Sequence, residues 1–85
     1  MKVCFAERGW EDYLHWLKTD RKMHGKINDL IKAIQREPYA GIGKPEPLRF
    51  GLAGYWSRRI DQEHRIVYKV DNDTLFIAQC RHHYG

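Results

Sequence analysis

Two helical apolar patterns, adjacent in the first half of the chain, restrict most strongly what it can fold into. The first has the i, i+3, i+4, i+7 spacing of an amphipathic helix, comprises Trp10, Tyr13, Leu14 and Leu17, and predicts a helix over 7–18. The second pattern comprises Met23, Ile27, Leu30, Ile31 and Ile34. It begins after Asp20, a good N-cap, and stops before Pro38, which cannot continue a helix. Such a hairpin has one apolar side, so the rest of the chain must supply the other half of the core.

The second half of the chain has the pattern of a β-sheet. Short apolar runs alternate with turn signals, which is typical of strands. Together with a short N-terminal strand at 2–5, the expected strands are 47–50, 55–60, 65–70 and 74–82. The sequence therefore predicts an α+β fold in a single domain that spans 1–85.

Alternation within these strands predicts two chemically different faces of the sheet. If both hairpin loops have odd length, the face that packs on the helices carries Trp56, Ile60, Ile66, Tyr68, Val70, Phe76, Ala78 and Cys80. The opposite face then carries Arg59, Arg65, Gln79, Arg81 and His83. Arg58 shares the parity of Trp56, so we expect its stem to pack at the sheet margin and its head to lie in water.

Composition adds only weak indications of function. The formal charge of +4 favours a polyanionic partner, but the excess is spread over both halves of the 85 residues. Cys4 and Cys80 lie in different predicted strands, and free thiols are favoured over a disulfide. No run is long and apolar enough for a signal peptide or a membrane span, which predicts a cytoplasmic protein without a membrane partner.

Glu46 is a candidate general base. It lies between Pro45 and Pro47, which restrict the backbone and hold Glu46 extended. A carboxylate on such a stiff segment is oriented at little entropic cost, which suits a catalytic role. The alternative is an exposed loop glutamate.

A second group of candidates lies on the cationic face and at the chain end. Arg65 is expected directly across from Arg59, where a bound anion would relieve their repulsion, although solvent or pairing with nearby carboxylates is an alternative. His83 could serve as an acid and Tyr84 could stack on a base, unless both belong to a disordered polar tail. His82 has the opposite parity and is expected to pack or to link.

The sequence predicts neither a metal site nor a cofactor. The possible ligands His64, Cys80, His82 and His83 lack the paired spacing of zinc sites, and adjacent strand residues point to opposite faces. The glycines match no phosphate-binding fingerprint.

Four motifs together resemble the YoeB/Txe toxins of the RelE superfamily. They are Lys-Pro-Glu-Pro-Leu at 44–48, Trp-Ser-Arg-Arg-Ile at 56–60, Glu-His-Arg at 63–65 and His-Tyr at 83–84. The resemblance implies a RelE-like fold with two helices on a twisted, mainly antiparallel sheet. It also implies an endoribonuclease that inhibits translation by cutting mRNA in the A site of the 70S ribosome.

The same resemblance implies a role for each matching residue. Glu46 would activate the ribose 2′-hydroxyl, and Arg65, helped by Arg59, would stabilise charge on the phosphate. His83 would protonate the leaving oxygen, Tyr84 would align the substrate, and the RNA phosphates would be bound by Lys44 and Arg49. Arg49 stands where close relatives often carry Lys, which keeps the charge but changes the donor geometry.

The resemblance further implies the partners. These are a second copy of the chain in a homodimer, a cognate YefM-like antitoxin, and operator DNA bound only by the toxin–antitoxin complex. The alternatives are a non-enzymatic basic protein that binds DNA and antitoxin, and the gyrase-poison branch of the same fold. The presence of Glu46, Arg65 and His83 together argues against the second.

Overall fold

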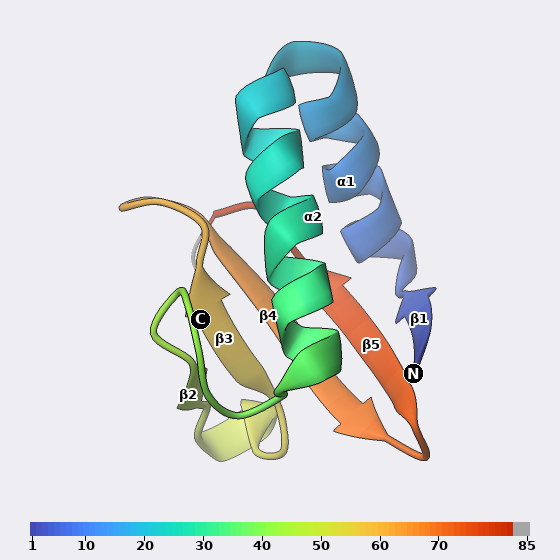
Figure 1. Ribbon diagram of the computed structural model, residues 1–85, viewed down its shortest axis with the longest axis vertical. Coiled ribbons are helices and arrows are strands. Elements are labelled where there is room, and N and C mark those ends of the chain that lie inside the picture. Colours follow the sequence, from blue (N-terminus) through green and yellow to red (C-terminus); the bar gives the residue numbers. More distant parts are fainter. Residues whose placement is uncertain (83–85) are drawn as a thin grey trace.

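The computed structural model describes residues 1–82, in which a helical hairpin covers one face of a sheet (Figure 1). The elements in chain order are β1 (Lys2–Phe5), α1 (Glu7–Thr19), α2 (Arg21–Arg36), β2 (Glu46–Pro47), the 3-10 helix η1 (Phe50–Leu52), β3 (Trp56–Arg59), β4 (Arg65–Asp71) and β5 (Thr74–Gln79). The strand order is β1-β5-β4-β3-β2, with β1 parallel to β5 and the other pairs antiparallel. The predicted α+β fold, with two helices on a mainly antiparallel sheet, is confirmed.

Helix α2 follows the sequence prediction closely. Asp20 Oδ1 accepts the backbone N–H of Met23 at 3.1 Å, which caps the helix as expected. The helix ends at Arg36, before Pro38, and its buried face includes Ile27 and Ile34, both 0% exposed. No helix within residues 1–82 is long and apolar enough to cross a membrane.

Helix α1 has nearly the predicted bounds, and Tyr13 of the predicted apolar face packs against the core, but the fully buried positions of the helix are different ones. The residues that face the sheet are Gly9, Asp12 and Trp16, whereas Trp10 stays 47% exposed. Gly9 allows a close approach, because a Cβ there would lie 2.5 Å from the carbonyl oxygen of Ile77. Asp12 and Trp16 face inward because both bind main-chain groups at the end of β5. The spacing of apolar residues along the helix does not reveal these contacts of Asp12 and Trp16.

The predicted face of β5 was also wrong in its first half. The turn between β4 and β5 has two residues, Asn72 and Asp73, both with a left-handed backbone (φ 52° and 56°). Left-handed backbone at both positions is typical of a two-residue type I′ hairpin turn, which has even rather than odd length. Leu75 and Ile77 therefore face the helices, and Phe76 and Ala78 do not.

A β-bulge then reverses the alternation. The adjacent residues Val67 and Tyr68 of β4 pair with Gln79 and Ile77 of β5, which leaves one residue of β5 without a partner. Because the parity changes at this point, Cys80 lies in the core as predicted, with 0% exposure. The strand ends at Gln79, although the sequence predicted that it would continue to 82.

Arg58 was expected to hold its head in water, and this was wrong. The residue is 0% exposed. Its Nε donates to the Tyr68 hydroxyl at 3.2 Å, while its Nη atoms donate at 2.6–3.1 Å to the carbonyl oxygens of Glu37, Ala40 and Ile42. Carbonyls of the loop after α2 satisfy the buried guanidinium, so Arg58 ties this loop to β3.

Both cysteines are free, as predicted. Cys4 is exposed and Cys80 is buried. Burial raises the pKa of the Cys80 thiol to about 12, and the nearby charge of Asp12 adds to the effect. Cys80 is therefore a core residue with little thiolate character at neutral pH.

Candidate active site

The sheet face away from the helices brings together three of the predicted site residues. Glu46 pairs with Ser57, and in the next row along the strands Arg59 pairs with Arg65. Residues that are direct partners share a face, and so do residues two apart on one strand. Glu46, Arg59 and Arg65 therefore lie on one face, which the helices do not cover (Figure 1). The predicted pairing of the two arginines is confirmed.

Gln79 lies at the far end of the row of cross-strand partners that begins at Glu46. The row runs through Ser57 and Val67, which are themselves cross-strand partners, and Val67 pairs with Gln79. The Gln79 Nε2 atom is buried and makes no hydrogen bond within the described residues. An unpaired buried donor is costly, so this amide is a locally unsatisfied position of the sheet.

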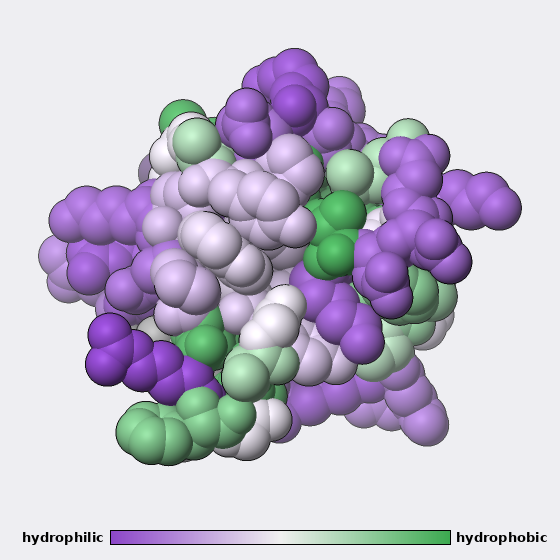
Figure 2. Space-filling model, turned by 90° about the horizontal axis from the view of Figure 1, so that it is seen from below, coloured by the Kyte–Doolittle hydropathy of each residue, from purple (hydrophilic) through white to green (hydrophobic). Residues whose placement is uncertain are grey.

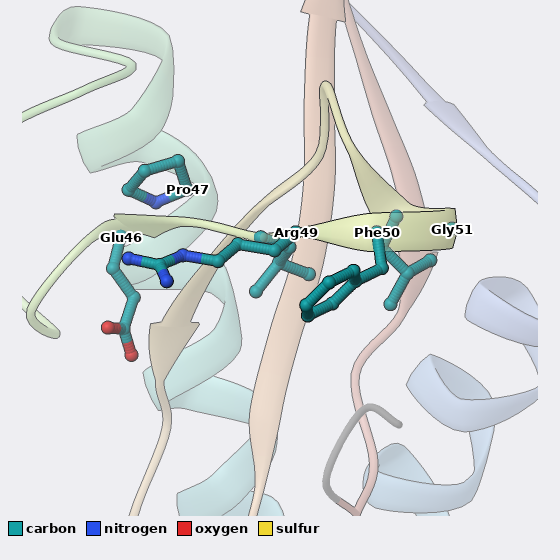
Figure 3. Close-up of a pocket in the computed structure, with 7 residues that line it drawn as sticks. Glu46, Pro47, Arg49, Phe50 and Gly51 are labelled. Carbon is teal, nitrogen blue, oxygen red and sulfur yellow. The ribbon is translucent and has the colours of Figure 1, made fainter.

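The segment that carries Glu46 leaves the sheet almost at once. The sequence predicted a strand over 47–50, but β2 ends at Pro47 and η1 begins at Phe50. The reason is local, since Phe50 adopts a left-handed φ of 58°, which interrupts an extended strand. Residues 46–52 line a hollow of about 670 Å³ (Figure 3).

Phe50 is a candidate site residue that the sequence analysis missed. It is 93% exposed, although it is a large apolar side chain. In Figure 3 its ring lies on the same side of the segment as the Glu46 carboxylate, while Pro47 points the other way and Arg49 extends toward Glu46. The available signal in the sequence was an aromatic residue in a cationic segment next to Gly51.

The cations predicted for the site lack carboxylate partners in the described part of the chain. The ion pairs within residues 1–82 join the N-terminus to Asp73 and Arg8 to Asp12, and the 3.8 Å contact of His64 with Glu63 would be an ion pair only with a protonated imidazole. None of them involves the predicted substrate-binding or charge-stabilising cations, which are Lys44, Arg49, Arg59 and Arg65. Seen from below, many hydrophilic side chains project from this end of the molecule, with hydrophobic side chains exposed between them (Figure 2). The four cations are available for an anionic ligand.

Arg65 is held by its own turn and not by a carboxylate. Its Nη1 donates to the carbonyl oxygens of Asp61 at 2.9 Å, Gln62 at 3.3 Å and His64 at 3.1 Å. This excludes the predicted alternative of pairing with the Asp61 or Glu63 carboxylates, because no such pair occurs within residues 1–82. One arm of the guanidinium braces the β3–β4 turn, and this fixes the position of the side chain.

Asp61 stabilises the same turn from its other end. Its Oδ1 accepts the backbone N–H groups of His64 at 2.7 Å and Glu63 at 2.9 Å. Burial acts to raise the pKa of the Asp61 carboxyl, but these backbone donors outweigh it and the pKa is lowered from its ordinary value. The carboxylate form is thus favoured, and the turn that precedes Arg65 is fixed at both ends.

His64 and His82 lie together with Glu63, and their possible metal-ligand atoms are within 4.8 Å of one another. However, His64 Nδ1 already accepts the backbone N–H of His82 at 2.7 Å. A neutral imidazole that accepts at Nδ1 carries its proton on Nε2, so neither nitrogen offers a free lone pair. The contact indicates a structural link, and the packing or linking role expected for His82 agrees with it.

Two predicted site residues, His83 and Tyr84, lie outside the described residues, so their roles stay predictions. The chain that leads to them is described as far as His82. The backbone oxygen of His82 accepts the N–H of Arg65 at 3.1 Å. The point at which the chain leaves toward 83–84 is thus adjacent to the cationic row.

Comparison with known proteins gives strong matches over nearly the whole chain. The sequence model of the YoeB-like toxins of bacterial type II toxin–antitoxin systems matches residues 5–84. The toxin YoeB of Streptomyces coelicolor is 56% identical over 84 residues, which cover 99% of this chain and 100% of that toxin. A solved YoeB/ParE toxin from Agrobacterium tumefaciens is 52% identical, with a TM-score of 0.96 and coverage of 99% and 100%.

Two further solved structures contain YoeB from Staphylococcus aureus. One is a YoeB–YefM complex, 46% identical with a TM-score of 0.92, and the match covers 99% of this chain and 98% of that one. The other is a YoeB dimer, 47% identical, with the same TM-score and coverage. Similarity at this level extends through every element that carries the candidate site.

Proposed function

Because the chain belongs to the YoeB-like toxin family of bacterial type II toxin–antitoxin systems, we propose that it is an endoribonuclease. It cleaves mRNA in the A site of the 70S ribosome and so inhibits translation. The observation that supports this most is the placement of Glu46 with Arg59 and Arg65 on one uncovered face of the sheet. A carboxylate base and fixed guanidinium groups can cleave RNA without a metal.

The proposed reaction uses the ribose as the nucleophile. Glu46 removes the proton of the 2′-hydroxyl, and the oxygen attacks the adjacent phosphorus. Arg65, with Arg59, stabilises the charge that develops on the phosphate oxygens. The P–O5′ bond breaks as His83 donates a proton to the leaving oxygen, which gives a 2′,3′-cyclic phosphate and a 5′-hydroxyl. DNA has no 2′-hydroxyl, so this reaction does not cut it.

The substrate is bound by residues near the hollow and by the end of the chain. Lys44 and Arg49, both exposed, contact RNA phosphates. Phe50 offers a ring on which an unpaired base can stack. Tyr84 aligns the substrate. The bound nucleotide thus has its phosphate beside cations and its base against an apolar ring.

The family also supports specific partners. YoeB of S. aureus forms a dimer and a complex with YefM. By analogy, this chain forms a homodimer in the cytoplasm, is inhibited by a YefM-like antitoxin, and joins operator DNA only in the toxin–antitoxin complex.

The experiment that tests the activity is cleavage with purified components. Ribosomes carrying a defined mRNA are incubated with the protein, and the cut sites are mapped by primer extension. We expect cuts within the A-site codon, and protein pretreated with a chelator should cut equally well in the normal ribosome buffer. Intact mRNA together with trapped DNA–gyrase cleavage complexes would contradict the proposal and favour the gyrase-poison alternative.

A further inference from the structure

The chain that follows β5 is held by side chains and not by a regular ladder of strand hydrogen bonds. At Cys80, the backbone N–H donates to Asp12 Oδ2 at 3.1 Å and the carbonyl accepts Trp16 Nε1–H at 2.9 Å. At His82, the backbone N–H donates to His64 Nδ1 at 2.7 Å. Asp12, Trp16 and His64 are each at most 9% exposed. Three buried side chains thus fix the backbone of residues 80–82.

These three side chains also support one another. The Trp16 and His64 rings meet edge to face, with centroids 4.8 Å apart. Asp12 and Trp16 lie one helical turn apart on α1, so they reach the N–H and the carbonyl of the same residue, Cys80. His64 is held in turn by the β3–β4 loop, since its backbone N–H is bound to Asp61. The anchor is rigid because each member belongs to a fixed element.

His82 shows why such an anchor is needed. Its φ is 66°, a left-handed conformation that turns the chain away from the line of β5. A non-glycine residue in this region is strained and needs surrounding contacts to persist. The bond to His64 on one side and the bond from the Arg65 N–H to the His82 oxygen on the other supply those contacts.

We propose that Asp12, Trp16 and His64 form a latch that positions the catalytic chain end. The latch fixes the backbone up to His82, the residue from which the chain continues to the proposed acid His83 and to Tyr84. This inference rests on the proposed function. His64 is the central member: it is a positioning residue, required as the neutral tautomer that accepts at Nδ1.

The test replaces the acceptor while keeping the ring. H64F preserves an aromatic ring for the edge contact with Trp16 but has no acceptor for the His82 N–H. We expect amide hydrogen exchange at His82, followed by NMR, to become faster. The single-turnover cleavage rate at saturating ribosome should fall about 10²-fold, as expected for a misplaced reacting group, with the half-saturating concentration nearly unchanged. H64N should restore part of the protection of the His82 amide and part of the cleavage rate, because its amide oxygen occupies the same δ position and can accept the hydrogen bond.

A matched control is H24F. His24 is another partly buried histidine, and its ring packs on Tyr13 at 4.5 Å, but it makes no hydrogen bond to residues 80–82. This variant should keep the wild-type rate and His82 exchange. Unchanged His82 exchange in H64F would overturn the latch, whatever the activity. Faster exchange with a full cleavage rate would overturn its positioning role. Failure of the unmodified chain to cut RNA would instead refute the proposed function, and it would be seen before any variant is compared.

Discussion

Arg59 of β3 and Arg65 of β4 face each other directly across the two strands, on the side of the sheet away from the helices. Like charges in this position repel, and neither residue forms an ion pair with a carboxylate within residues 1–82. Arg65 is also prevented from turning away, because its Nη1 is bound to three carbonyl oxygens of its own turn. The arrangement keeps positive charge concentrated on this face of the sheet, where we propose that the phosphate binds.

Arg65→Ala should reduce the maximal cleavage rate and not only the affinity. The guanidinium can donate to two phosphate oxygens as charge accumulates, so its loss should remove about 2–4 kcal/mol of transition-state stabilisation. Arg65→Lys should recover only part of this, since an ammonium lacks the planar fork. Single-turnover kinetics at saturating ribosome measure the effect. A change confined to the half-saturating concentration would make Arg65 an RNA anchor.

Glu46→Gln should remove the general base while leaving the segment intact. Glu46 is exposed and makes no hydrogen bond through its side chain within residues 1–82, so the fold should not change. We expect the single-turnover rate to fall about 10²-fold or more, with ribosome binding unaltered. Glu11→Gln, at an exposed site on α1, is the matched control. A variant that cuts as fast as Glu11→Gln would exclude Glu46 as the base.

Local signals in the sequence were sufficient for some elements of the fold. Asp20 and Pro38 are start and stop signals that act within a few residues, so the bounds of α2 could be predicted. The pairing of Arg59 with Arg65 could also be predicted, because it depends only on the odd length of the loop between them. These features predicted correctly that Arg59 and Arg65 lie across from each other.

Other features depend on contacts between distant parts of the chain, and these were predicted wrongly. The inward face of α1 is set by Asp12 and Trp16, whose partner is the backbone of Cys80, more than sixty residues away. The face of β5 is set by a two-residue turn and a bulge, which the alternation of residues does not reveal. Phe50 was missed because its exposure is known only once the segment has left the sheet.

Phe50→Ala should weaken RNA binding more than the maximal rate. Stacking of a base on an aromatic ring contributes about 1–3 kcal/mol, and it is present in the ground state as well as the transition state. The half-saturating concentration should rise about 5-fold or more, which corresponds to the lower end of that range, and Phe50→Trp should keep the wild-type value. Tyr39→Ala removes another exposed aromatic side chain and serves as the control. Equal effects at both positions would show that the loss is not specific to stacking at Phe50.

The two thiols should differ sharply in reactivity. Cys4 is exposed, whereas burial raises the pKa of Cys80 to about 12. At neutral pH, iodoacetamide should label one cysteine in the folded protein and both after unfolding, as measured by mass spectrometry. Rapid labelling of Cys80 in the native state would mean that the chain around residue 80 opens readily, which would weaken the argument for a rigid anchor there.

Arg58→Met should destabilise the protein strongly, although Arg58 has no role in the proposed chemistry. Methionine has a similar length and no charge, so it fills most of the space but leaves the carbonyl oxygens of Glu37, Ala40 and Ile42 without their donor. A hydrogen bond from a charged donor contributes about 1.5–3 kcal/mol, so the loss of these bonds should lower the free energy of unfolding by about 3 kcal/mol or more. Urea unfolding followed by circular dichroism measures the change. Arg59→Met, on the next residue of the same strand, removes an exposed guanidinium and should change stability by less than about 1 kcal/mol. If the two variants had equal stability, the network around Arg58 would not hold the loop to β3 in solution.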